Sequence, residues 1–201
     1  MGEKKIVDWR GVRGLVAAKL LTDTSEGVTY DTPFPVAGIS TLSKTTETSS
    51  ATKYYDNEPA IAINSVGGNE VSIDASAIPE DVQAKLLGEF YDETTGMYVE
   101  GNPEMPYFAI GYITKKTDGS EVFVWRLKGK FSYPESEHNT EDDGTDSNGS
   151  TLVYNGISTL HSFTKNGGPA KAVNVLAEKY SKGEAKFFET VQTPDTVGAA
   201  G

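Results

Sequence analysis

The sequence between Tyr107 and Tyr133 constrains the fold most, because it has the pattern of a β-hairpin. Two segments that favour strands, Tyr107–Lys116 and Glu121–Tyr133, flank the turn sequence Thr117-Asp118-Gly119-Ser120. Asp-Gly between alternating segments is the favoured connection of a short antiparallel hairpin. The sequence therefore predicts two neighbouring antiparallel strands here.

The second strand of this hairpin is expected to bury one face. Alternation places large apolar side chains on that face, namely Phe123, Trp125, Leu127 and Phe131. The opposite face carries Val122 and Val124 and then three cations, Arg126, Lys128 and Lys130. Two interpretations of these cations stay open: a solvated face, or a surface with acidic partners.

Further strands are predicted along the chain, separated by turn residues. Their ranges are Leu15–Leu21, Val28–Tyr30, Val36–Leu42, Ala60–Asn64, Glu70–Ser76 and Thr151–Thr159. Gly67-Gly68-Asn69 is expected to be a turn between two of them. Hydrophobic residues make up 37% of the chain, with 21 Gly and 9 Pro. This balance favours a mainly β or α+β fold, and no linker divides residues 1–201 into two domains.

Two segments have helical spacing. Pro79-Glu80-Asp81 is suited to a helix start, and an apolar stripe follows at Val82, Leu86, Leu87 and Phe90, with Gly88 as the expected end. Farther along, Val173, Leu176, Ala177 and Tyr180 repeat the helical spacing. Phe187, Phe188 and Val191 are expected to form a last apolar cluster.

Four segments are expected to lie outside the packed core. Residues 1–14 are either a frayed end leading into a first strand or an arm that docks on a neighbouring copy. Residues 43–58, rich in Thr and Ser, are an extended loop or a hairpin arm. Residues 134–150 form an acidic loop without Lys or Arg, and residues 192–201 a flexible tail.

Charge and composition exclude several classes of protein. The chain has 18 Lys and Arg against 29 Asp and Glu, a net charge of −11, which argues against binding to nucleic-acid phosphates. Cysteine is absent, so disulfides and thiolate chemistry are excluded. No apolar segment has the length of a membrane span and no export signal is recognised, so we expect a soluble protein made in the cytoplasm.

The search for catalytic and binding groups is negative. The two histidines, His138 and His161, lack the spacing of metal ligands or a nucleophile elbow. Gly144 and Gly149 have P-loop spacing, but Ser150 replaces the required lysine, and Ser150 also stands where a calcium loop needs its Glu. We therefore expect no catalytic, cofactor or metal site. Two alternatives remain: a carbohydrate-binding module with an exposed aromatic platform, or a glycoside hydrolase with an unrecognised carboxylate pair and with Trp9 and Trp125 to stack on sugars.

Several motifs in order along the chain resemble a known family. They are Val28–Tyr30 with Pro33, Tyr55-Asp56-Asn57, Pro79–Asp92, Thr95-Gly96, Pro106–Tyr112, Thr117-Asp118-Gly119, Val124-Trp125, Lys130-Phe131 and Phe187–Val191. In this register, over residues 28–194, the chain resembles the major tail proteins of long-tailed bacteriophages of the phi-thirteen type.

The resemblance implies a β-sandwich or barrel-like subunit with a flanking helix and extended arms. It also implies hexameric rings that stack into the tail tube of the virion, built around a tape-measure protein and bounded by tail-end proteins, with DNA passing through without specific binding. On this basis we expect residues 43–53 to bridge adjacent rings and residues 1–14 to dock laterally or below. The candidate subunit-contact residues are Trp9, Thr46, Thr48, Thr52, Arg126, Lys128 and Lys130.

Overall fold

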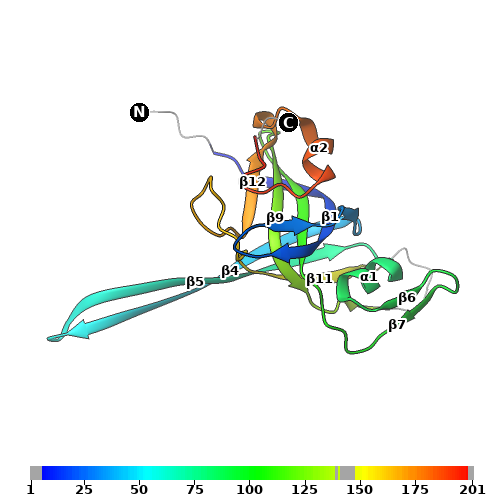
Figure 1. The fold of residues 1–201 in the computed structure, drawn as a ribbon, viewed down its shortest axis with the longest axis horizontal. Helices are drawn as coiled ribbons and strands as arrows, with labels where there is room; N and C mark the ends of the chain where they lie inside the picture. Colours follow the sequence, from blue (N-terminus) through cyan, green and yellow to red (C-terminus); the bar gives the residue numbers. More distant parts are fainter. Residues whose placement is uncertain (1–5, 139, 141–147, 199–201) are drawn as a thin grey trace.

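The structure, a computed structural model, describes residues 6–138, 140 and 148–198. Residues 1–5 of the predicted N-terminal arm, 139 and 141–147 of the predicted acidic loop, and 199–201 of the predicted tail lie outside this description. The described chain is mainly β with two α-helices, which confirms the predicted fold class (Figure 1).

Twelve strands make up most of the structure. They are β1 (Trp9–Asp23), β2 (Val28–Tyr30), β3 (Phe34–Pro35), β4 (Ile39–Tyr55), β5 (Glu58–Ala75), β6 (Phe90–Asp92), β7 (Met97–Val99), β8 (Phe108–Lys116), β9 (Glu121–Phe131), β10 (Glu135–Ser136), β11 (Ser150–Gly156) and β12 (Ala172–Leu176). The helices are α1 (Glu80–Leu87), a 3-10 turn, η1 (Ala177–Lys179), and α2 (Gly183–Glu189).

One large antiparallel sheet organises the molecule. Its main path runs β2-β1-β8-β9-β11-β5-β4, with β3 beside β1, β10 beside β11, and β12 beside β9. The predicted hairpin is its centre: β8 and β9 pair from Ile110 with Arg126 to Lys115 with Glu121, around a turn in which Gly119 has φ of 87°. A separate two-stranded sheet, β6–β7, lies beside α1 (Figure 1).

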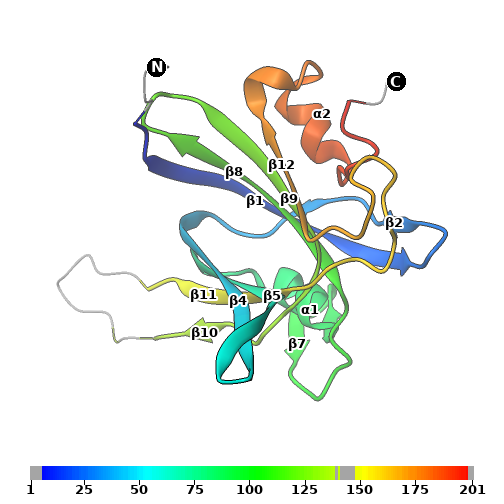
Figure 2. The same ribbon diagram turned by 90° about the vertical axis from the view of Figure 1, so that its left-hand side faces the viewer.

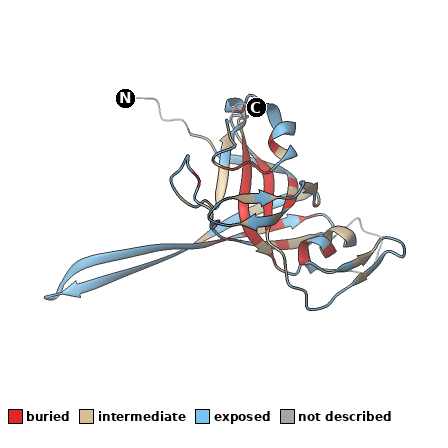
Figure 3. Ribbon diagram, viewed as in Figure 1, coloured by how far each residue is buried: buried red, intermediate tan, exposed pale blue. Residues whose placement is uncertain are grey.

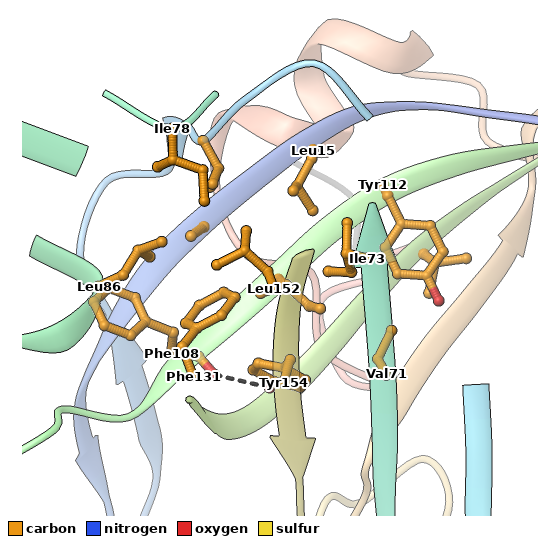
Figure 4. Close-up of a cluster of buried hydrophobic side chains, with 14 of the residues drawn as sticks. Leu15, Val71, Ile73, Ile78, Leu86, Phe108, Tyr112, Phe131, Leu152 and Tyr154 are labelled. Atoms are coloured by element: carbon orange, nitrogen blue, oxygen red, sulfur yellow. Dashed lines mark hydrogen bonds between the residues drawn. The ribbon is translucent and has the colours of Figure 1, made fainter. Parts of the chain in front are cut away.

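A first core cluster lies inside the curve of the sheet. Side chains from β1 and from β5 pack into the same cluster, although these strands are far apart in the sheet order, as Leu15 and Ile73 illustrate (Figure 4). The hydroxyl of buried Tyr154 donates a 2.9 Å hydrogen bond to the carbonyl of Phe108. The sheet therefore bends around this cluster as an open, barrel-like layer (Figure 2).

A second core cluster covers the other face of β9 at Phe123, Trp125 and Leu127. Helix α2 packs there, because Phe187 is fully buried and its carbonyl accepts a 3.1 Å hydrogen bond from the indole of Trp125. Both faces of β9 are thus buried, as the red central strands in Figure 3 show. The prediction of one solvated face on this strand is wrong.

A β-bulge in β9 also changes the face on which Phe131 lies. Phe108 pairs with Gly129 and Ile110 with Arg126, so a step of two residues on β8 matches three on β9. The extra residue reverses the alternation beyond it. Phe131 therefore packs in the first cluster, and the prediction that it shares a face with Phe123 is wrong.

The first predicted helix is present, and the second is a strand. α1 ends at Gly88, whose φ of 75° gives the left-handed cap, but Phe90 lies beyond it in β6 and is exposed. The segment with Val173 is β12, because residues 122–126 of β9 offer an open edge that β11 leaves unpaired. Helix α2 was not predicted from the sequence.

Gly67 and Gly68 do not form the predicted turn. They lie within continuous β5, at a bulge where Thr46 pairs with Asn69 and Thr48 with Val66. A Cβ on Gly68 would lie 3.1 Å from the carbonyl oxygen of Gly156. The glycines therefore serve close backbone approach at a bulge rather than a chain reversal.

The described part of the predicted flexible tail is docked on the body. Gln192 and Thr193 are buried, and Val197 packs against the second core cluster. Asp195 accepts hydrogen bonds from the backbone N–H groups of Thr164 and Lys165, at 3.0 and 2.8 Å. These bonds hold residues 192–198 in place, so the prediction of flexibility is wrong for them.

Candidate assembly surfaces

A long two-stranded arm projects from the sheet. β4 and β5 pair out to Tyr55 with Glu58, and all residues from 47 to 67 are exposed (Figures 1 and 3). Asp56 and Asn57 form the tip with φ of 52° and 65°, the conformation of a type I′ hairpin turn. Of the two structures predicted for residues 43–58, the chain adopts the hairpin.

The two faces of the arm differ in chemistry. Thr48 pairs with Val66 and Thr52 with Ala62, so the predicted contact residues Thr48 and Thr52 share one face, and alternation adds Thr46 near the base. The opposite face carries Ile61 and Ile63, each 47% exposed. The sequence pattern predicted an ordinary strand for this isoleucine pair and gave no indication that both side chains are exposed.

The base of the arm is fixed to the body. The ammonium of Lys171, in the segment before β12, donates a hydrogen bond to the carbonyl of Gly67. At the bulge itself Asn69 is buried, and farther into the sheet β5 pairs with β11, from Asn69 with Gly156 to Ala75 with Ser150. The arm is therefore an extension of a core strand rather than a separate loop.

A second exposed apolar surface lies on β6–β7. Phe90 pairs with Val99 and Asp92 with Met97, so the outer face of this hairpin carries Phe90, Met97 and Val99, which are 59%, 49% and 44% exposed. This surface was not predicted from the sequence. Alternation around the Thr95-Gly96 turn was the signal that could have indicated it.

A carboxylate ties this hairpin to the body. Glu89 accepts hydrogen bonds from the hydroxyls of Tyr98 and Tyr133 and from the N–H of Gly101. Partial burial acts to raise the pKa of Glu89, but these hydrogen bonds outweigh it and lower the pKa. Burial and the neighbouring Glu89 raise the pKa of Tyr98 to about 12, so at neutral pH it remains a hydrogen-bond donor.

The three cations of β9 have different surroundings. Lys128 forms a buried ion pair with Asp23 at 2.6 Å, so its charge is met within the chain, where the sequence predicted a partner on a neighbouring subunit. The ammonium nitrogen of Lys130 lies 4.6 Å from the ring centre of Tyr107. Arg126 is 7% exposed, and its guanidinium donates hydrogen bonds only to the hydroxyl of Tyr112 among the described residues.

Trp9 is the first residue of β1. It pairs with Lys116, whose ammonium lies 5.4 Å from the indole centre, and the side chain is 66% exposed. Residues 9–14 therefore belong to the first strand of the sheet, so of the two interpretations of residues 1–14 the structure supports a first strand rather than an arm for these residues.

The side chains considered for sugar binding, catalysis or metal binding do not form a common site in the described structure. Trp125 is fully buried and is unavailable for stacking on a sugar. The Nδ1 of His161 lies 3.2 Å from the carbonyl of Ser25, and its ring packs edge-on against Phe163. His138 is exposed. Within the described ranges no cluster of His, Asp or Glu could hold a metal ion.

The chain matches the family model described as phage tail tube protein over residues 15–199 of its 201 residues. The chain belongs to the phage tail tube protein family. A search of curated proteins finds no match. In the part of the chain that the structure describes, no helix has the length and apolar character to cross a membrane.

As a tail tube protein, the chain is a structural component of the virion tail, where identical subunits assemble into a tube. A structural family points away from catalysis. The exposed arm and the β6–β7 surface are therefore candidate assembly surfaces of this tail tube protein.

Proposed function

We propose that this tail tube protein assembles into hexameric rings that stack into a hollow tube, and that the tube conducts DNA during ejection into the host. The exposed arm carries the proposal. A two-stranded ribbon is marginally stable alone in water, and this one projects with Ile61, Ile63 and Val66 unburied. A neighbouring copy that covers the arm would stabilise the arm and the contact between the two copies.

Contacts along and around the tube would use different surfaces. The arm, with the candidate residues Thr46, Thr48 and Thr52, bridges adjacent rings, because it extends farthest from the body (Figure 1). The β6–β7 surface and the exposed Trp9 are candidates for contacts within a ring. Head-to-tail contacts of this kind close a ring when the rotation permits and repeat along an axis when it does not.

The net charge of −11 suits a conduit for DNA. Duplex DNA carries about one negative charge per 1.7 Å of axis, so a basic lining would bind it at many points and slow its passage. An acidic lining would repel the phosphates. We assign part of the acidic excess to the bore, with the tape-measure protein filling it before ejection and tail-end proteins closing the tube.

Electron microscopy tests the assembly. Concentrated protein, alone and with tail tips as initiators, should give hollow cylinders with sixfold end views. A matched variant replaces residues 48–66 by an Asn-Gly turn, which removes exposed residues only and keeps the hydrogen bond from Lys171 to Gly67. It should keep the thermal unfolding temperature of the body and lose stacking. Failure of the full chain to form rings or tubes even on tail tips would refute the proposal.

A further inference from the structure

A cleft of about 860 Å³ opens where the two free ends of the curved sheet face each other. Trp9–Val12 of β1 lie on one side and Ser40–Leu42 of β4 on the other. β4 is the last strand of the sheet, and β2 and β3 pair only with Val16–Asp23 of β1. Both sides of the cleft are therefore unpaired strand edges within the described residues.

The cleft is cationic in an acidic protein. Its lining includes Arg10, Lys44 and Arg126, and it includes no Asp or Glu. The chain as a whole has 29 acidic residues against 18 basic ones. Such a lining attracts a carboxylate and disfavours a basic or purely apolar segment.

Arg126 is the buried member of this set. Its Nε and Nη2 both donate to the hydroxyl of Tyr112, at 3.1 and 2.9 Å, and no described carboxylate pairs with it. Exposed Arg13, by contrast, pairs with both Glu121 and Glu184. Because a buried charge is costly until it is paired, Arg126 is suited to receive a carboxylate from outside the chain.

The arm tip has the complementary chemistry. Asp56 and Glu58 place two carboxylates at a tight turn, beside exposed Tyr54 and Tyr55. The arm behind this turn has only two strands, so both of its outer edges carry backbone N–H and C=O groups that can pair with another strand edge. In its own chain the tip has no such surface, because β4 runs extended from Lys44 at the cleft to Tyr55, about 35 Å away at the usual rise per residue.

We propose that the arm tip of one copy inserts into this cleft on the next copy, where a carboxylate of Asp56 or Glu58 pairs with Arg126. This inference rests on the proposed function and names the surface that receives the arm. Because the tip and the cleft lie at opposite ends of the same hairpin, the contact joins different surfaces on the two copies. Repetition therefore extends the assembly along the arm.

Cysteine cross-linking tests the contact, because the natural chain has no cysteine. Asn57→Cys at the tip is combined with Asn174→Cys or Ser40→Cys, which line the cleft from β12 and β4. Under oxidation, assembled tubes should give a ladder of covalent multimers on a non-reducing gel. The control pair combines Asn57→Cys with Thr24→Cys, an exposed residue that does not line the cleft, and should give no ladder.

Adding Asp56→Asn and Glu58→Gln tests the part of the carboxylates, and should reduce the cross-linking yield several-fold. Tubes that form but give no ladder from either cleft position, or the same ladder with Thr24→Cys, would overturn this inference and leave the proposed function intact. A ladder whose yield the neutral tip leaves unchanged would overturn the ion pair. Absence of tubes on tail tips would overturn both proposals.

Discussion

The buried ion pair of Lys128 and Asp23 shows how a charged side chain is accommodated in the core. The two side chains are 9% and 4% exposed, and Asp23 also accepts hydrogen bonds from the backbone N–H groups of Leu160 and His161. Burial acts to raise the pKa of Asp23, but Lys128 and the two backbone donors lower it overall. The pair therefore joins the end of β1 to β9 and to the 160–161 segment.

Replacing Asp23 tests this pair. Asp23→Asn leaves the ammonium of Lys128 buried without its partner, and should reduce the free energy of unfolding at pH 7 by about 3–5 kcal/mol. Because the folded pKa of Asp23 is lowered, its contribution is present above its unfolded pKa of about 4 and is lost as pH falls through the folded value. Urea unfolding of the dilute protein at pH 7 and pH 3 should thus show a smaller difference at pH 3. Exposed Glu26→Gln is the control, and an equal loss there would contradict the argument.

Gly129 at the β9 bulge is a second position at which the structure leaves no room for a Cβ atom. A Cβ there would lie 2.4 Å from the Cζ of Tyr154 and 2.6 Å from the carbonyl oxygen of Asn155. Gly129→Ala should therefore lower the free energy of unfolding by about 1–3 kcal/mol, since the buried ring and the backbone cannot both move away. Gly101→Ala, with nothing within 4 Å, should change it little in the same denaturation series.

The arm carries apolar side chains although it is exposed to solvent. Its strands follow the pairing rules of any hairpin, including a 3.0 Å hydrogen bond between the hydroxyls of Ser49 and Ser65, yet residues 47–67 are all exposed. A polar ribbon would be expected if solvent were its final environment. The isoleucines at positions 61 and 63 instead favour a covered face in the assembly.

The two faces of the arm can be separated by mutation. Ile61→Asp with Ile63→Asp should prevent tube formation and leave the unfolding temperature of the dilute monomer unchanged, because both side chains are exposed there. Thr48→Asp with Thr52→Asp is the matched pair on the opposite face. Electron microscopy and sedimentation of both variants would show which face is covered. Normal tubes from the isoleucine variant would exclude that face as a contact.

The distribution of charge over the molecule connects the subunit with the tube. Acidic side chains outnumber basic ones by 29 to 18, and several cations are occupied internally, as Lys128 is by Asp23 and Arg13 by Glu121 and Glu184. These pairs remove acidic side chains together with the cations, so the rest of the molecule keeps a large acidic excess. Repulsion between like-charged copies must be offset by local contacts such as the arm.

Reversing acidic residues that face the bore tests the conduit. With Lys at such positions, tubes should still assemble but genome ejection should slow, because each added cation binds phosphate during passage. Ejection triggered in vitro and followed by DNA-dye fluorescence measures this rate, at low and high salt. Reversal of acids on the outer surface is the control. An unchanged rate in the bore variants would exclude this explanation of the charge.

Local sequence patterns were sufficient for the elements that local chemistry specifies. Asp118-Gly119 specified the β8–β9 hairpin, and Pro79 with Gly88 marked the ends of α1. The resemblance to the tail protein family also came from short motifs read in order, and the family match over residues 15–199 bears it out. The sequence proposed the Thr face of the arm as a contact surface, which stays a prediction, and it gave no indication of the exposed Ile61, Ile63 and β6–β7 surface.

The remaining features depend on contacts between distant segments, which no local pattern encodes. The segment with Val173 became a strand because β9 left an edge open, and Phe131 changed face because a bulge opposite β8 shifted the register. Among the described residues Lys128 has a carboxylate partner and Arg126 has none, because Asp23 lies beside Lys128 alone. The sequence by itself thus determined the turns, the helix ends and the alternation of apolar side chains. Which edges and charges remain available to a neighbour was decided by tertiary packing, because pairing in a sheet and burial of charge depend on residues far away in the chain.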